Sequence, residues 1–189
     1  MSVVLNDEMA SVIILIFAKN HVGSNVFLFD RIPAAKLQNA RRRFAPNMGV
    51  DEGVIMLLDG TVLGSSKDGI LLTTRRLYNK NSFEKAEFME LADIKELTFK
   101  PHALAPEICA ISAIGTMKKV ISNIRAEAFF NSLQETILFL QNPAAYLAAH
   151  RNQQADASVA VTAPAPTRCN GCGAVGAWVV CEYCGSPMQ

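Results

Sequence analysis

Four cysteines near the end of the chain constrain its fold more than any other feature. They form two C-x-x-C pairs, Cys169 with Cys172 and Cys181 with Cys184, separated by eight residues. Thiolates are soft ligands that suit tetrahedral zinc, and each C-x-x-C turn delivers two sulfurs from one tight loop. A glycine follows each pair, where a residue without Cβ turns at little steric cost. Two facing turns that share one metal ion are therefore predicted.

Disulfides and a redox pair are the alternative interpretations of these cysteines. Both halves carry the same C-x-x-C-G pattern, and too little sequence flanks them to build the βαβ surroundings of a thioredoxin-like site. Four coordinating thiolates leave no open position on the metal, so the predicted Zn²⁺, one per chain, is structural and not catalytic.

Length and charge limit what the rest of the chain can be. With 189 residues there is room for one ordinary domain and a small appendage. The formal net charge of +1 excludes a global basic field of the kind that drives non-specific nucleic-acid binding. The fifth cysteine, Cys109, lies in the apolar run 108–114 and is predicted to be a reduced core residue. This cysteine usage suits a reducing compartment and predicts a cytoplasmic protein, with membrane association as the alternative.

The N-terminal segment, 1–49, contains an apolar stretch at 9–18. Crossing a bilayer as a helix takes about twenty residues, so this stretch is too short. The preceding residues include Asp7 and Glu8 and lack the positive charge of a signal peptide. A buried helix or strand is predicted, with a membrane-dipping segment as the alternative. A second helix is expected at 33–44, because the fixed φ of proline suits a first helical turn.

The middle of the chain has the sequence pattern of a β structure that is covered at one end by a helix. Short apolar runs at spacings typical of an antiparallel sandwich or barrel predict strands at 54–58, 61–63, 70–74, 76–78, 88–91, 94–99, 107–113 and 117–121. A stripe at helical spacing then predicts a helix that covers an open end of a bent sheet, and its members are Ala126, Phe129, Phe130, Leu133, Ile137 and Leu140. The predicted class is α+β and mainly β.

A change of composition follows this helix. Residues 152–167 are rich in alanine, glutamine, threonine and proline without apolar periodicity, which predicts a linker. The expected organisation is therefore an N-terminal segment to residue 49, a β body at 50–151, this linker, and a metal module at 168–189.

Two resemblances to known families follow from these motifs. The tail from Cys169 to Pro187 resembles the very small zinc-ribbon domains at the ends of many bacterial proteins, with the form C-x-x-C-G, a short hairpin, then C-x-x-C-G-x-x. The body resembles the bacterial pleckstrin-homology-like (PH-like) domains over about 50–142. That resemblance rests on the segments 54–61, 64–78 and 88–94, which include a glycine-led strand ending in threonine and a following Arg-Leu-Tyr. It implies two nearly orthogonal sheets capped by a C-terminal helix, and it brings no catalytic group.

An enzyme is the least supported class. The three histidines lie far apart in the sequence, and no nucleophile elbow, P-loop, dinucleotide-binding glycine motif or HExxH is present. The first functional hypothesis is therefore a non-enzymatic adaptor or scaffold. Its body would bind a protein partner or a second copy, and the tethered ribbon would provide another contact. No small-molecule substrate is expected.

A membrane-peripheral protein is the second hypothesis. It requires a basic rim that contacts anions or lipid headgroups, and the candidates are Arg41, Arg42, Arg43, Lys67, Arg75, Arg76 and Lys80. A solvated helix end, with cations favourable near its C-terminus, is the simpler interpretation of the three consecutive arginines. Nucleic-acid binding through the ribbon is the third hypothesis. It is disfavoured because Arg168 is the one basic residue of that tail.

Overall fold

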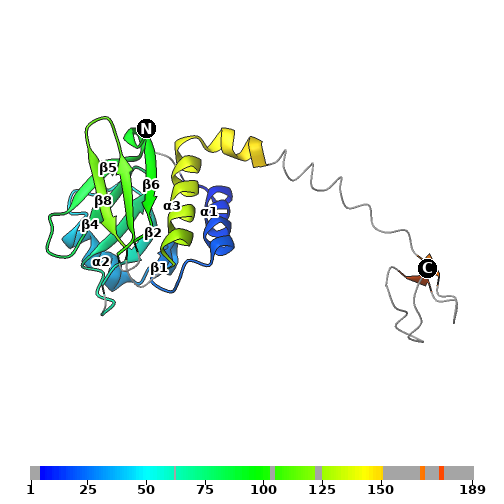
Figure 1. Ribbon diagram of the computed structural model, residues 1–189, viewed down its shortest axis with the longest axis horizontal. Helices are drawn as coiled ribbons and strands as arrows, with labels where there is room; N and C mark the ends of the chain where they lie inside the picture. The colour runs from blue at the N-terminus through cyan, green and yellow to red at the C-terminus, as the bar shows by residue number, and fades with distance from the viewer. Residues whose placement is uncertain are drawn as a thin grey trace. The chain divides into compact units, whose positions relative to one another are not determined.

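The structure of the chain is a computed structural model. It describes residues 5–61, 63–102, 105–121 and 125–150, together with the backbone of 167–168 and 175–176. The chain divides into two compact units, Met1–Tyr146 and Leu147–Gln189. The first unit has an α+β architecture with two antiparallel sheets, as the sequence predicts at the level of class (Figure 1). The N-terminal segment belongs to this same unit.

The larger sheet has five strands in sequential order, each antiparallel to its neighbour. Four of them correspond to predicted runs, and the first was not predicted. The strands are β1 (Val26–Leu28), β2 (Val54–Asp59), β3 (Gly69–Thr73), β4 (Arg76–Lys80) and β5 (Glu87–Glu90). A short 3₁₀ turn, Phe29–Arg31, follows β1.

The predicted strand at 61–63 is wrong, because Thr61 lies in the β2–β3 loop. The Asp59 carboxylate at the end of β2 accepts hydrogen bonds from the backbone N–H of Thr61 (3.0 Å) and from its hydroxyl (2.6 Å). It also accepts one from the Ser66 N–H (3.1 Å) and one from the Lys36 ammonium. A polar turn built around one carboxylate therefore replaces strand pairing at this point.

The smaller sheet has three strands and follows the predicted runs at 94–99, 107–113 and 117–121. It contains β6 (Glu96–Lys100), β7 (Glu107–Ile111) and β8 (Thr116–Val120) in sequential antiparallel order. A second 3₁₀ turn, Leu91–Asp93, links the two sheets.

Helix α2 (Ala34–Arg43) confirms the helix predicted at 33–44 and covers one face of the larger sheet. Leu57, Leu71 and Tyr78 lie in register on neighbouring strands, and each is buried in one cluster with α2 and the residues that flank it. Successive residues of a strand point to opposite faces of the sheet. The residues that come before and after these three along their strands are buried on the other face of the sheet. Both faces of β2 are thus covered, which explains why its sequence is continuously apolar and does not alternate.

Helix α1 (Asp7–Asn20) contains the apolar N-terminal stretch, for which a buried helix or strand is predicted, and the structure shows the helix. It begins after Asn6, whose side chain accepts a hydrogen bond from the Met9 N–H at 2.9 Å, the usual role of an N-cap. One face is buried through Met9, Ile13, Ile16 and Phe17. Among the described residues, no helix has the length and apolarity needed to cross a bilayer.

Helix α3 (Ala126–Gln141) confirms the predicted closing helix, and its buried face is broader than the predicted stripe, because Ser132, Thr136 and Phe139 are also buried. It packs beside α1, as Figure 1 shows. The rings of Phe129 and Phe17 are 6.5 Å apart, and the Asn20 amide donates to the Ser132 hydroxyl at 2.9 Å. Phe129 therefore contacts α1, while the ring of its neighbour Phe130 stacks on Phe99 of β6 at 5.5 Å, as expected for a helix that covers the β body.

After α3, the described residues form a helix at 143–150 and two short strands. Strands β9 (Thr167–Arg168) and β10 (Val175–Gly176) belong to the second unit and pair antiparallel, with Val175 opposite Arg168. The predicted linker, at 152–167, lies outside the described residues except for Thr167.

Candidate functional site

A hollow of about 410 Å³ separates strand β5 from the turn that joins β7 to β8. Its apolar lining includes Phe88 and Ile114, which are 49% and 90% exposed. Its polar lining includes Glu87, Glu90 and Asp93. Among the residues that the structure describes, no lysine or arginine lines this hollow. We call it the β5–β8 hollow.

Two asparagine side chains close the gap between the sheets at one end of this hollow. The Asn79 and Asn81 amides donate to the Lys118 carbonyl at 2.7 and 3.0 Å. The Asn81 side-chain oxygen accepts from the Val120 N–H at 3.2 Å. These bonds occupy backbone groups of the second half of β8. The first half of β8 remains beside the hollow, opposite β5, which is the last strand of its sheet.

The carboxylates around the hollow differ in their partners. Glu90 accepts from the guanidinium groups of Arg75 (2.9 Å) and Arg76 (2.6 Å). Burial acts to raise the pKa of Glu90, but these two hydrogen bonds prevail and lower it. Glu87 and Asp93 are exposed, and neither has an ion pair or side-chain hydrogen bond within the described part of the chain. Two free negative charges therefore lie at the rim.

Arg75 and Arg76, two candidates for lipid contact, both form ion pairs with Glu90 of the same chain. Arg76 also donates to the Glu52 carboxylate at 2.9 Å and to the Asn47 carbonyl at 3.2 Å. The Glu52 side chain is fully buried and additionally accepts from the Tyr78 hydroxyl and the Thr73 hydroxyl. This network fixes the loop before β2 onto the sheet.

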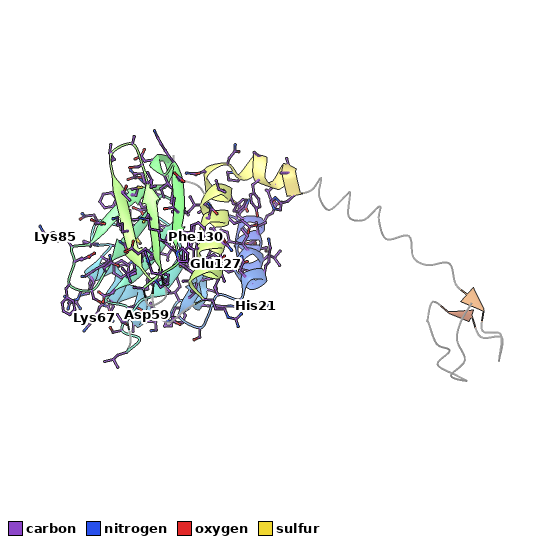
Figure 2. The ribbon with its side chains drawn as sticks, viewed as in Figure 1. His21, Asp59, Lys67, Lys85, Glu127 and Phe130 are labelled. Atoms are coloured by element: carbon purple, nitrogen blue, oxygen red, sulfur yellow. The ribbon has the colours of Figure 1, made fainter. Side chains whose placement is uncertain are left out.

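The other basic candidates do not gather at one place. Lys80 lies 3.8 Å from the Asp68 carboxylate and donates to the Glu84 carbonyl at 2.7 Å. Lys67 is exposed on the β2–β3 loop, near Asp59 (Figure 2). Asn39 of α2 contacts this loop through the Ser65 carbonyl, whereas the three arginines lie at the end of the helix. The structure thus places Lys67 on the β2–β3 loop, Lys80 on β4 and the three arginines at the end of α2.

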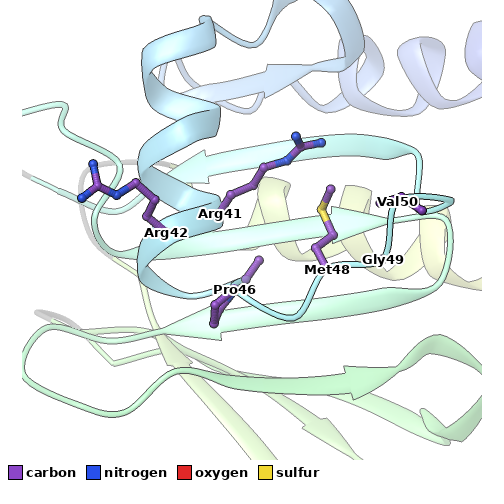
Figure 3. Close-up of a pocket in the computed structure, with 7 residues that line it drawn as sticks. Arg41, Arg42, Pro46, Met48, Gly49 and Val50 are labelled. Atoms are coloured by element: carbon purple, nitrogen blue, oxygen red, sulfur yellow. The ribbon is translucent and has the colours of Figure 1, made fainter.

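A second hollow, of about 500 Å³, lies at the end of α2 and includes Arg41 and Arg42 in its lining. Figure 3 shows the two guanidinium groups pointing to different sides of the helix, as expected for consecutive helical residues. Met48 and the fully exposed Val50 contribute apolar lining. Arg41, Arg42 and Arg43 have no carboxylate partner among the described residues.

The four predicted zinc ligands, Cys169, Cys172, Cys181 and Cys184, lie outside the described residues. Strands β9 and β10 are described, and they flank the first C-x-x-C pair on either side. The side chains invoked for nucleic-acid contact, including that of Arg168, are likewise not described. In the part of the chain that the structure does describe, no three His, Cys, Asp or Glu side chains converge as metal ligands.

Sequence reasoning found some of these features and missed others. Cys109 is buried, as predicted, and it is a free cysteine within the described part of the chain. The β5–β8 hollow was missed, because its walls come from two separate segments, 86–93 and 112–117, and only the fold brings them together. Phe88 and Ile114 carry no sequence signal that distinguishes them from core residues. Comparison of the chain with family models, curated proteins and solved structures found no match.

Proposed function

We propose that this protein is a non-enzymatic adaptor. Its PH-like body binds a protein partner at the open edge of the larger sheet, and its C-terminal zinc ribbon provides a second contact. Two linked contacts raise the effective concentration of the second binding event, so each can be weak by itself.

The order of the elements supports the PH-like assignment. Strands β2–β5 form one meander, β6–β8 form a second, and α3 follows, which is the succession that the resemblance implies. Strand β1 and helices α1 and α2 are additions from the N-terminal segment, which lies before the region of resemblance. They cover surfaces of the body, and in the part of the chain that the structure describes no strand pairs with the outer edge of β5.

The backbone of the second unit supports the ribbon assignment. Strands β9 and β10 pair antiparallel on either side of the segment that contains the first C-x-x-C pair, and a zinc knuckle is expected between two paired strands of this kind. Zn²⁺ held by Cys169, Cys172, Cys181 and Cys184 would have four thiolate ligands and a structural role.

The unpaired edge of β5, facing β8 across a hollow, is the observation that carries the proposal. Exposed sheet edges are sites where an extended segment of another chain adds a strand. Native proteins usually cover or shorten such edges, and this one is lined by exposed apolar side chains.

Site-specific photocrosslinking in the cell of origin tests this function. A photoreactive amino acid at Ile114, on the rim of the hollow, is compared with one at Leu63, on the β2–β3 loop. Both side chains are at least 90% exposed, so neither substitution disturbs the core. We expect a discrete protein adduct from position 114 and none from position 63. Equal labelling from both positions, or none from either, would contradict the adaptor function.

Membrane association is the second candidate function, favoured by the unpaired arginines at the end of α2 beside the exposed Val50. Each basic residue near an anionic surface contributes about 1 kcal/mol. Sedimentation with phosphatidylserine vesicles, compared with neutral vesicles, measures this attraction. If the candidate holds, the triple substitution Arg41→Gln, Arg42→Gln and Arg43→Gln abolishes a salt-sensitive sedimentation of the full chain.

A further inference from the structure

We infer that the β5–β8 hollow binds an extended segment rich in lysine or arginine, which adds to β5 as a new edge strand. This inference rests on the proposed adaptor function and specifies its partner by chemistry. Backbone geometry, apolar lining and charge each contribute to it.

The backbone of β5 provides the template. On its inner side β5 pairs with β4, with Phe88 opposite Tyr78, and on its outer side it pairs with no strand of the described residues. Since Asn81 already bridges to Lys118 and Val120, the open space lies beside the first half of β8. An incoming strand would therefore fill the place where the two sheets separate.

Apolar side chains beside this edge give such a strand something to pack against. Phe88 is half exposed, yet its orientation is fixed, because the Arg76 guanidinium stacks over its ring at 5.0 Å. Ile114 is 90% exposed at the tip of the β7–β8 turn. An extended segment presents alternate side chains to one side, so every second residue of the partner would enter the hollow.

Charge selects the class of partner. Glu90 is already neutralised by Arg75 and Arg76, but Glu87 and Asp93 have no partner among the described residues. None of the described basic side chains lines the hollow. The residues of the partner that point away from the apolar lining are therefore expected to be lysine or arginine.

The same carboxylates would have a different role if they only protect the edge. Charged residues on an edge strand prevent it from pairing with another copy of the chain. Removing the charges would then cause self-association and would leave peptide affinity unchanged, so the two roles give opposite results.

Binding of two designed peptides to the full chain tests the inference by fluorescence anisotropy. One peptide alternates valine with lysine and the other alternates valine with glutamate. Two exposed ion pairs contribute about 1 kcal/mol together, so the lysine peptide should bind roughly three- to tenfold more tightly. The double variant Glu87→Lys, Asp93→Lys should reverse this preference, and the control Asp30→Lys, at an exposed carboxylate elsewhere on the unit, should preserve it.

A structural readout distinguishes strand addition from loose electrostatic contact. Hydrogen exchange of amides in 87–90 should slow when the lysine peptide binds. No preference between the peptides, reversal by Asp30→Lys, or binding without amide protection would each overturn the inference. Self-association of the double variant Glu87→Ala, Asp93→Ala at unchanged peptide affinity would also overturn it. The adaptor function is tested by a different experiment, and it is contradicted if the photocrosslinker at position 114 captures no protein.

Discussion

Asp59 shows how one residue organises a loop. Burial acts to raise its pKa, but hydrogen bonds from Lys36, Thr61 and Ser66 prevail and lower the pKa from 3.8 to about 2. Because the folded pKa is depressed, the ionised carboxylate stabilises the fold above about pH 4, and this contribution is lost as the pH falls towards 2. We expect Asp59→Asn to lower the free energy of unfolding by about 2 kcal/mol near neutral pH.

Urea unfolding of the wild type and Asp59→Asn, at pH 6 and at pH 2.5, measures this contribution. The difference between the two proteins should shrink at the lower pH. A difference that stays constant between the two pH values would show that the side chain acts through its shape and not through its charge.

Lys119 is a buried cation with the opposite effect on stability. It is 6% exposed, and its ammonium donates to the Lys80 carbonyl at 2.6 Å. Burial lowers its pKa from 10.5 to about 8, although Asp68 and Glu84 oppose the shift. Between these pH values the unfolded chain binds more protons, so this group makes stability rise with pH. We expect Lys119→Met to remove that rise.

The free energy of unfolding at pH 7 and at pH 9.5 tests this assignment. Lys118→Met, at the exposed neighbouring position, should leave the pH dependence unchanged. If Lys118→Met and Lys119→Met flatten the profile equally, burial of Lys119 is not its cause.

At the scale of the element, α3 is the central packing helix of the first unit. Phe129 is fully buried, whereas Leu138 on the same helix is 57% exposed. Truncating a buried phenylalanine costs about 3–5 kcal/mol, against a total domain stability of about 5–15 kcal/mol. We expect Phe129→Ala to lower the melting temperature of the first unit sharply and Leu138→Ala to change it little. Thermal unfolding followed by circular dichroism compares them, and equal effects would contradict the packing of Phe129 against α1.

Local sequence patterns were enough to predict where the helices and strands lie, but not which distant residues their side chains contact. Apolar periodicity located α3, short apolar runs located most strands, and a proline located the start of α2, because each of these signals is local in the sequence. It could not show that the polar Ser132 is buried in a contact with α1, since the partner, Asn20, is 112 residues away. Likewise Arg76 looks free in sequence because its carboxylate partners, Glu52 and Glu90, are distant along the chain.

At the scale of the whole molecule, the two units should respond to metal removal independently. We expect about one equivalent of zinc per chain, since four thiolates form one tetrahedral site. Chelation should unfold the second unit, because such modules derive their folding free energy from the metal. It should leave the unfolding temperature of the first unit unchanged, because the predicted linker separates the two. Elemental analysis and calorimetry measure the two quantities.

Matched variants test the zinc assignment. Cys172→Ser should lose the metal, whereas Cys109→Ala, at the buried cysteine of β7, should keep it. Metal-free protein with four titratable thiols in the tail would contradict the assignment.

The pairing of α1 with α3 has a consequence for how the chain is made. Their contact between Asn20 and Ser132 joins positions 112 residues apart. At translation rates of about 5–20 residues per second, the ribosome needs roughly ten seconds to produce the second helix after the first. During that interval the apolar face of α1 has no partner to bury it. A nascent chain of this kind depends on chaperones more than the size of its finished fold suggests.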